Sequence, residues 1–318
     1  MPNKKQKIKK KKNSRSVSGE ELNDPFGGIA LSCGVVLRNR KIMTLAMRDE
    51  LGNIELVSAK LKRSARKNRF LYYPLIRGIA FFVEALVINL LALFYKRRFI
   101  KKNLKTKTIY HRFFVRLRQY VLYIVYLALA VAIFNYLSAN LQGYPIVTWD
   151  MGLYNWAVTF GYLILFALIF ILIATLTREE ADWLFYHGVE HKIIRALEKK
   201  GKISIDSLRK ESLLDDRCSL IAWVWTMIFV SGAVSFLHLS GAPFGVVMIV
   251  LLGIIIFAFA LAYELVWWSL KYRGIFYTIF IWPFTIVERI FIREPDEAHF
   301  KIGLAALGEI QKLNKRWR

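Results

Sequence analysis

Residues 219–263 read SLIAWVWTMIFVSGAVSFLHLSGAPFGVVMIVLLGIIIFAFALAY and contain no Asp, Glu, Lys or Arg. One membrane crossing takes about 20 apolar residues, so this run is too long for one helix and long enough for two. The segment Leu-Ser-Gly-Ala-Pro at 239–243 favours a turn near the middle of the run. We therefore expect transmembrane helices at 220–237 and 244–267, joined as a hairpin.

A second apolar block lies between Arg118 and Arg178, where Asp150 is the only charged residue. Its turn signal at 138–145 predicts two further transmembrane helices, at 114–137 and 151–176. The whole chain of 318 residues is 56% hydrophobic and carries a formal charge of +24, which indicates a membrane protein with basic aqueous segments. The expected fold class is all-α integral membrane, with four transmembrane helices in two hairpins.

The distribution of lysine and arginine predicts the orientation of these hairpins. Both turns lack lysine and arginine, whereas the segments at the other ends of the hairpins are rich in these residues. By the positive-inside rule, both termini of this multi-pass protein lie on the cytoplasmic side of the cell membrane. Anionic lipid headgroups are the expected partners of the basic segments, and no motif predicts specific nucleic-acid binding.

Two other apolar segments carry charges and do not fit this pattern as simple crossings. They are 72–95, which contains Arg77 and Glu84, and 274–292, which contains a proline and two charges. If the first crossed the membrane, the basic cluster that follows it would break the charge rule, so we expect both to be interfacial helices on the cytoplasmic side. A chain with six spans is the alternative. Arg77 and Glu84, seven residues apart on one helix face, are expected to pair.

The remaining organisation follows from composition. Residues 1–26 form a charged tail that is expected to be disordered. Alternating apolar runs at 29–37, 42–47 and 54–59 predict a small cytoplasmic β element of about three strands within 27–62. The membrane domain is expected to fill 63–318, with a cytoplasmic insert at 177–216 and a C-terminal helix at 295–313.

The cytoplasmic insert contains the motif that points to chemistry. A helix expected over 179–198 carries His187-Gly-Val-Glu190-His191. Residues i and i+4 lie on one helix face, so both imidazoles can bind one divalent metal such as zinc, with Glu190 as the general base of a hydrolytic reaction. The alternative is a polar helix face at the membrane interface.

A third metal ligand must come from elsewhere in the chain, and the candidates are Asp215, Glu264 and Glu180. Glu264 lies in an otherwise apolar span, where an ionisable residue indicates a functional site. Its alternative role is an ion pair with Arg77 or Arg217. For Asp215 the alternative is an exposed loop carboxylate.

Four short blocks together resemble a known family of bacterial membrane proteins, the DUF1385 or YqhQ-like proteins. They are YHGVEHK at 186–192, REPDE at 293–297, PLIRG at 74–78 and AYE at 262–264. The resemblance extends from about Gly27 to Leu307. It implies a multi-span membrane fold and a metal-dependent enzyme, without an established substrate.

The chain departs from the family pattern at two positions. Cys33 stands where the family has a glutamate, and Asp215 stands where it has a histidine. A carboxylate can replace an imidazole as a hard metal ligand, so Asp215 stays among the candidates. We expect a metal-dependent, hydrolase-like membrane enzyme acting on a peptide or lipid at the cytoplasmic surface. The alternative is a transporter or membrane-assembly factor that uses the His/Glu cluster as an ion or proton site.

Overall fold

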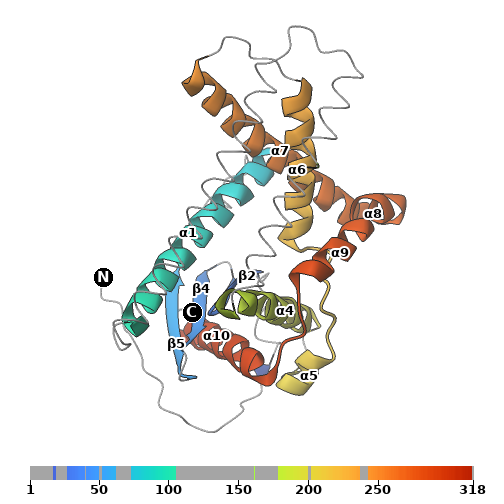
Figure 1. Ribbon diagram of the computed structural model, residues 1–318. Helices are drawn as coiled ribbons and strands as arrows, with labels where there is room; N and C mark the ends of the chain where they lie inside the picture. Colours follow the sequence, from blue (N-terminus) through green and yellow to red (C-terminus); the bar gives the residue numbers. More distant parts are fainter. Residues whose placement is uncertain are drawn as a thin grey trace.

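The computed structural model describes residues 17–18, 27–39, 41–49, 52–61, 73–104, 161, 178–199, 202–236 and 243–316. It confirms a mostly helical chain with a small N-terminal antiparallel β element (Figure 1). The transmembrane helices expected at 114–137 and 151–176 lie outside the described residues.

The β element is an antiparallel meander of four strands, β2 (Gly27–Leu31), β3 (Gly34–Arg38), β4 (Ile42–Arg48) and β5 (Ile54–Lys60). The run at 29–37, expected as one strand, is divided by a turn and contributes to two strands, β2 and β3. A Cβ atom at Gly34 would lie 1.9 Å from the Ala46 carbonyl oxygen, so only glycine allows this close approach to β4. A separate pair joins β1 (Val17–Ser18) to β6 (Lys202–Ile203).

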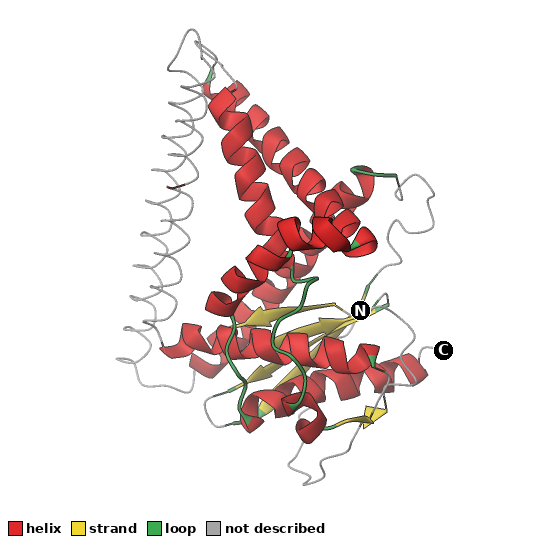
Figure 2. Ribbon diagram, turned by 90° about the vertical axis from the view of Figure 1, so that its right-hand side faces the viewer, coloured by secondary structure: helices red, strands yellow, loops and turns green. Residues whose placement is uncertain are grey.

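Helices cover both faces of the four-stranded sheet (Figures 1 and 2). On one face, α4 (Arg178–Glu198) and α10 (Glu297–Arg316) pack on Val35, Leu37 and Ile42. On the other face, α1 (Ile76–Leu104) packs on alternate residues of the same strands. The two apolar cores are separated by the sheet, because successive side chains of a strand point to opposite faces.

The apolar helices α6 (Ser219–Phe236) and α7 (Phe244–Tyr272) extend away from this layered unit and pack against each other (Figure 2). Next come two short helices, α8 (Gly274–Phe280) and α9 (Trp282–Glu288), and a 3-10 turn, η3 (Arg289–Phe291). Among the described residues, three segments are long and apolar enough to cross a membrane: Ile76–Lys102, Gly245–Tyr272 and Gly274–Phe291. They suggest a membrane protein.

Arg77 and Glu84 of α1 pair with residues of neighbouring elements rather than with each other. Arg77 Nε donates to Glu264 Oε1 of α7 at 2.7 Å, and its guanidinium lies over the Trp267 ring. Glu84 instead pairs with Arg38 of the sheet. The predicted pair between Arg77 and Glu84 is wrong, because seven residues of helix separate the two positions by about 10 Å.

Candidate metal centre

The two histidines of α4 form one side of a compact cluster. His187 and His191 are one turn apart, and their ring centroids are 4.4 Å apart. His187 Nδ1 lies 2.9 Å from the Phe291 carbonyl oxygen, and His191 Nδ1 lies 2.7 Å from that of Leu213. A carbonyl oxygen only accepts, so each Nδ1 carries a proton, and Nε2 is the atom of each ring that can bind a metal when the ring is neutral. This is the arrangement of metal-ligating histidines.

Cys218 completes the cluster. Its Sγ lies 3.5 Å from His187 Nε2, and one ligand atom from each of His187, His191 and Cys218 lies within 4.8 Å of the other two. The residue is buried directly before α6, and its backbone N–H donates to the Asp215 carbonyl. Two imidazoles and a thiolate are a donor set suited to zinc.

Glu288, at the end of α9, is the nearest carboxylate that the structure adds to this cluster. Its side chain is fully buried, and Oε1 lies 2.9 Å from His191 Nδ1 and accepts from the Asp215 backbone N–H at 3.1 Å. Oε2 has no hydrogen-bond partner among the described residues. A buried carboxylate oxygen without a partner costs free energy, and a nearby cation would offset that cost.

Burial controls the protonation of these groups. It lowers the pKa of His187 to about 4, an effect that the neighbouring His191 reinforces, so this ring is neutral at physiological pH. Burial alone would also lower the pKa of His191, but Cys218 and Glu288, which accept from the protonated ring, raise it well above its ordinary value. Burial raises the pKa of the Cys218 thiol and raises that of Glu190 to about 7.

Comparison with known proteins places the chain in a family. The model of a family described as Protein of unknown function (DUF1385) matches residues 73–313. The chain belongs to the DUF1385 family. No curated protein and no solved structure matches it. The DUF1385 match contains every residue of the cluster and leaves the four-stranded sheet outside.

The structure of this DUF1385 protein brings some of the predicted site residues together and places others apart from them. His187 and His191 converge as expected, and Glu190 lies on the same helix against β2, where a Cβ atom at Gly28 would be 2.5 Å from its Cγ. Asp215 is buried, which corrects the alternative of an exposed loop, and its Oδ1 accepts from the Arg217 backbone N–H.

Asp215 and Glu264, two of the carboxylates proposed as third ligands, lie outside the close cluster of His187, His191 and Cys218. Both oxygens of Glu264 accept hydrogen bonds from Arg77, so the structure shows the ion pair that the sequence left as the alternative. Glu180 belongs to α4, but its side chain lies outside the described part of the chain.

The segment 291–295, which follows α9, lies across α4 beside His187 and is called the strap below. The Arg293 backbone N–H donates to the Leu184 carbonyl at 3.1 Å, in addition to the bond between His187 and Phe291. A Cβ atom at Gly188 would lie 2.4 Å from the Arg293 carbonyl oxygen and 3.0 Å from Pro295 Cγ. The glycine of the motif is therefore what lets this segment lie close enough to hold His187.

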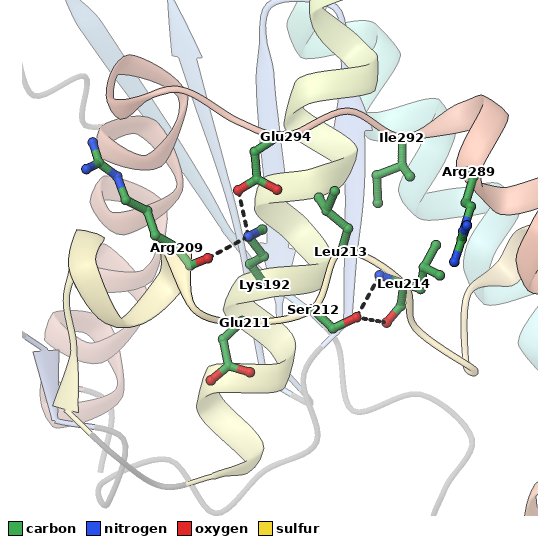
Figure 3. Close-up of a pocket in the computed structure, with 9 residues that line it drawn as sticks. All are labelled: Lys192, Arg209, Glu211, Ser212, Leu213, Leu214, Arg289, Ile292 and Glu294. Carbon is green, nitrogen blue, oxygen red and sulfur yellow. Dashed lines mark hydrogen bonds and ion pairs between the residues drawn. The ribbon is translucent and has the colours of Figure 1, made fainter.

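A pocket of about 470 Å³ lies beside the cluster (Figure 3). The ammonium group of Lys192 is buried in its wall, where it pairs with Glu294 at 2.7 Å and donates to the Arg209 carbonyl at the end of α5 (Ile205–Arg209). The lining residues are Lys192, Arg209, Glu211, Ser212, Leu213, Leu214, Arg289, Ile292 and Glu294. Leu213 thus faces this pocket while its carbonyl holds His191, so the pocket adjoins the Nδ1 side of that ring.

Proposed function

We propose that this protein is a metal-dependent, hydrolase-like membrane enzyme in which His187, His191 and Cys218 hold one divalent ion, with zinc as the best match to the donors. The observation that carries the proposal is the convergence of the three ligand atoms while both Nδ1 atoms are held by backbone carbonyls. The partnerless Glu288 Oε2 nearby also fits a cation. Sulfur and imidazole donors argue against magnesium or calcium, which prefer oxygen.

Three protein ligands would leave one position open, as in catalytic zinc sites. Zinc so held would supply a bound water molecule with a pKa lowered to about 7. Glu190 is the proposed general base, because its carboxyl group has a pKa of about 7 and lies on the same helix as both histidines. A base with such a pKa can accept a proton from water and release it again at neutral pH.

The proposed site of action is the cytoplasmic surface of the cell membrane. Cys218 immediately precedes the apolar helix α6, and Glu288 belongs to the apolar segment Gly274–Phe291. The cluster thus lies where apolar segments meet the layered unit of sheet and helices. The substrate in this proposal is a peptide or lipid that reaches the membrane surface, and both termini lie in the cytoplasm as part of the four-span topology.

The packing of α1 supports an interfacial position for this helix within that topology. Glu84, Ile88, Ala92 and Phe99 all contact the sheet, so this part of the helix runs along it. A crossing there would place open sheet edges in hydrocarbon, where their backbone groups find no partners. The outward face is apolar at helical spacing, with Ile79, Val83, Leu86, Val87, Leu90, Leu93 and Phe94. Exposed basic residues follow at 97–98 and 101–102, where anionic headgroups would bind.

Metal analysis of protein purified without chelator tests the proposal. We expect about one zinc per chain, and we expect His187→Ala and His191→Ala each to remove most of it while membrane insertion persists. His299→Gln is the matched control, because His299 on α10 is also buried but bonds Asp296, which directly precedes that helix. Glu190→Gln should keep the metal and abolish hydrolytic activity.

Two results together would refute the proposal of a metal-dependent enzyme. The first is that wild-type protein contains no metal, and the second is that a His187→Ala/His191→Ala double variant still complements a deletion strain. That combination would favour the transporter or assembly factor.

A further inference from the structure

Glu288 differs from the other buried carboxylate of the apolar helices. Both oxygens of Glu264 accept from the Arg77 guanidinium, so its charge has a permanent partner. The only ion-pair partner of Glu288 among the described residues is the ring of His191. When that ring is neutral, as a metal ligand must be, the Glu288 carboxylate has no positive charge beside it.

Charge balance then indicates what the site takes up. An uncompensated carboxylate in a dry interior is strongly unfavourable. A bound dication would neutralise both the Cys218 thiolate and the Glu288 carboxylate, whereas a monocation would leave one negative charge. The buried Oε2 atom has no hydrogen-bond partner among the described residues, so the groups described around this carboxylate leave one of its oxygens available to a cation.

Glu288 also joins the three segments that build the cluster. Its Oε1 contacts His191 on α4 and accepts from the Asp215 backbone, which in turn positions Cys218 through the Asp215 carbonyl. The chain after Glu288 continues into η3, whose Phe291 carbonyl holds His187. Glu288 therefore contacts His191 directly, contacts the backbone that positions Cys218, and lies three residues before the carbonyl that holds His187.

We infer that Glu288 is the positioning residue of the metal site and that its negative charge favours a divalent ion there. This inference rests on the proposed metal site. The carboxylate lies 2.9 Å from His191 Nδ1, beside the Leu213 carbonyl that accepts from it, and its charge increases the basicity of Nε2, as outer carboxylates do for zinc-bound histidines. It does not contact the substrate.

The test is metal affinity in Glu288→Gln, a substitution that keeps size and the ability to accept hydrogen bonds but removes the charge. Competition with a chelator should show zinc binding weakened about 10- to 100-fold. Co²⁺ substituted for zinc should give a ligand-field spectrum shifted from that of the wild type, because loss of the charge lowers the basicity of His191 Nε2. Glu264→Gln is the matched control: it removes another buried carboxylate and should leave affinity and spectrum unchanged.

The outcomes separate this inference from the proposed function. Wild-type protein that binds neither Zn²⁺ nor Co²⁺ overturns both. Wild-type protein that binds zinc, with Glu288→Gln binding it equally tightly and with the same Co²⁺ spectrum, overturns only the role of Glu288. If Glu288→Gln does not accumulate in membranes, Glu288→Asp, which moves the charge by one methylene, should weaken binding and shift the spectrum. An unchanged affinity and spectrum in that variant also overturn the inference.

Discussion

Gly188→Ala is a sharp test of the close packing around the histidines. The new Cβ atom would lie 2.4 Å from the Arg293 carbonyl oxygen, whereas ordinary van der Waals contact of a Cβ atom is 3.4–4 Å. The obstacle is backbone, so the strap that contains Arg293 must move away from α4. We expect Phe291 to move with it and its bond to His187 to weaken.

The expected size of the effect combines two opposing contributions. Overpacking of a well-packed contact costs about 1–3 kcal/mol. Replacing a helical glycine with alanine returns about 1 kcal/mol. The net change is a loss of up to about 2 kcal/mol in the free energy of unfolding, together with weaker metal binding.

Thermal unfolding in detergent and zinc competition measure the two effects. Gly308→Ala on α10 is the control, because a Cβ atom there meets nothing within 4 Å and the substitution should be neutral or stabilising. If Gly188→Ala unfolds at the same temperature as Gly308→Ala or higher, and binds zinc as tightly as the wild type, the strap does not pack on α4 as described.

Three further predictions concern the thiol, pH and topology. Cys218→Ser should bind zinc more weakly and lose the thiolate charge-transfer absorption of the Co²⁺ protein, and an unchanged spectrum would exclude the thiolate as a ligand. Zinc affinity should rise with pH by up to about a hundredfold per unit, because the pKa values of the Cys218 thiol and the His191 ring are both raised and the ion must displace a proton from each; chelator competition that gives the same affinity at pH 6 and 8 would contradict this. In a cysteine-free background, single cysteines at Gly143 and Gly241 should react with an impermeant thiol reagent from outside, whereas a cysteine at Lys102 should react only after permeabilisation; external labelling at Lys102 would refute the four-span topology.

The sequence predicts what depends on local spacing. The charge-free run at 219–263 contains α6 and most of α7, and the i, i+4 spacing of His187 and His191 places both rings on one face. The same local reasoning failed for Arg77 and Glu84, because sharing a helix face is not enough when two turns lie between the residues. Each found a partner on another element.

The rest of the cluster depends on contacts between distant segments, which spacing does not reveal. The Phe291 carbonyl that holds His187 lies 104 residues further along the chain, and the thiol beside it lies 31 residues away. The available signals were a cysteine in the block Asp215-Asp216-Arg217-Cys218 and a carboxylate, Glu288, in an apolar segment. Neither signal identifies its partner without the fold.

The strap over α4 couples the apolar segment before it to the histidines. It is fixed by the Phe291 and Arg293 backbone bonds, by the contact of Pro295 with Gly188 and by the pair between Glu294 and Lys192. These attachments leave little room for it to slide. Because α9 leads into the strap with only the η3 turn between them, a tilt or change of depth of α9 would pull on the oxygen that orients His187. A change in bilayer thickness around α9 is therefore expected to alter the geometry of the candidate metal centre.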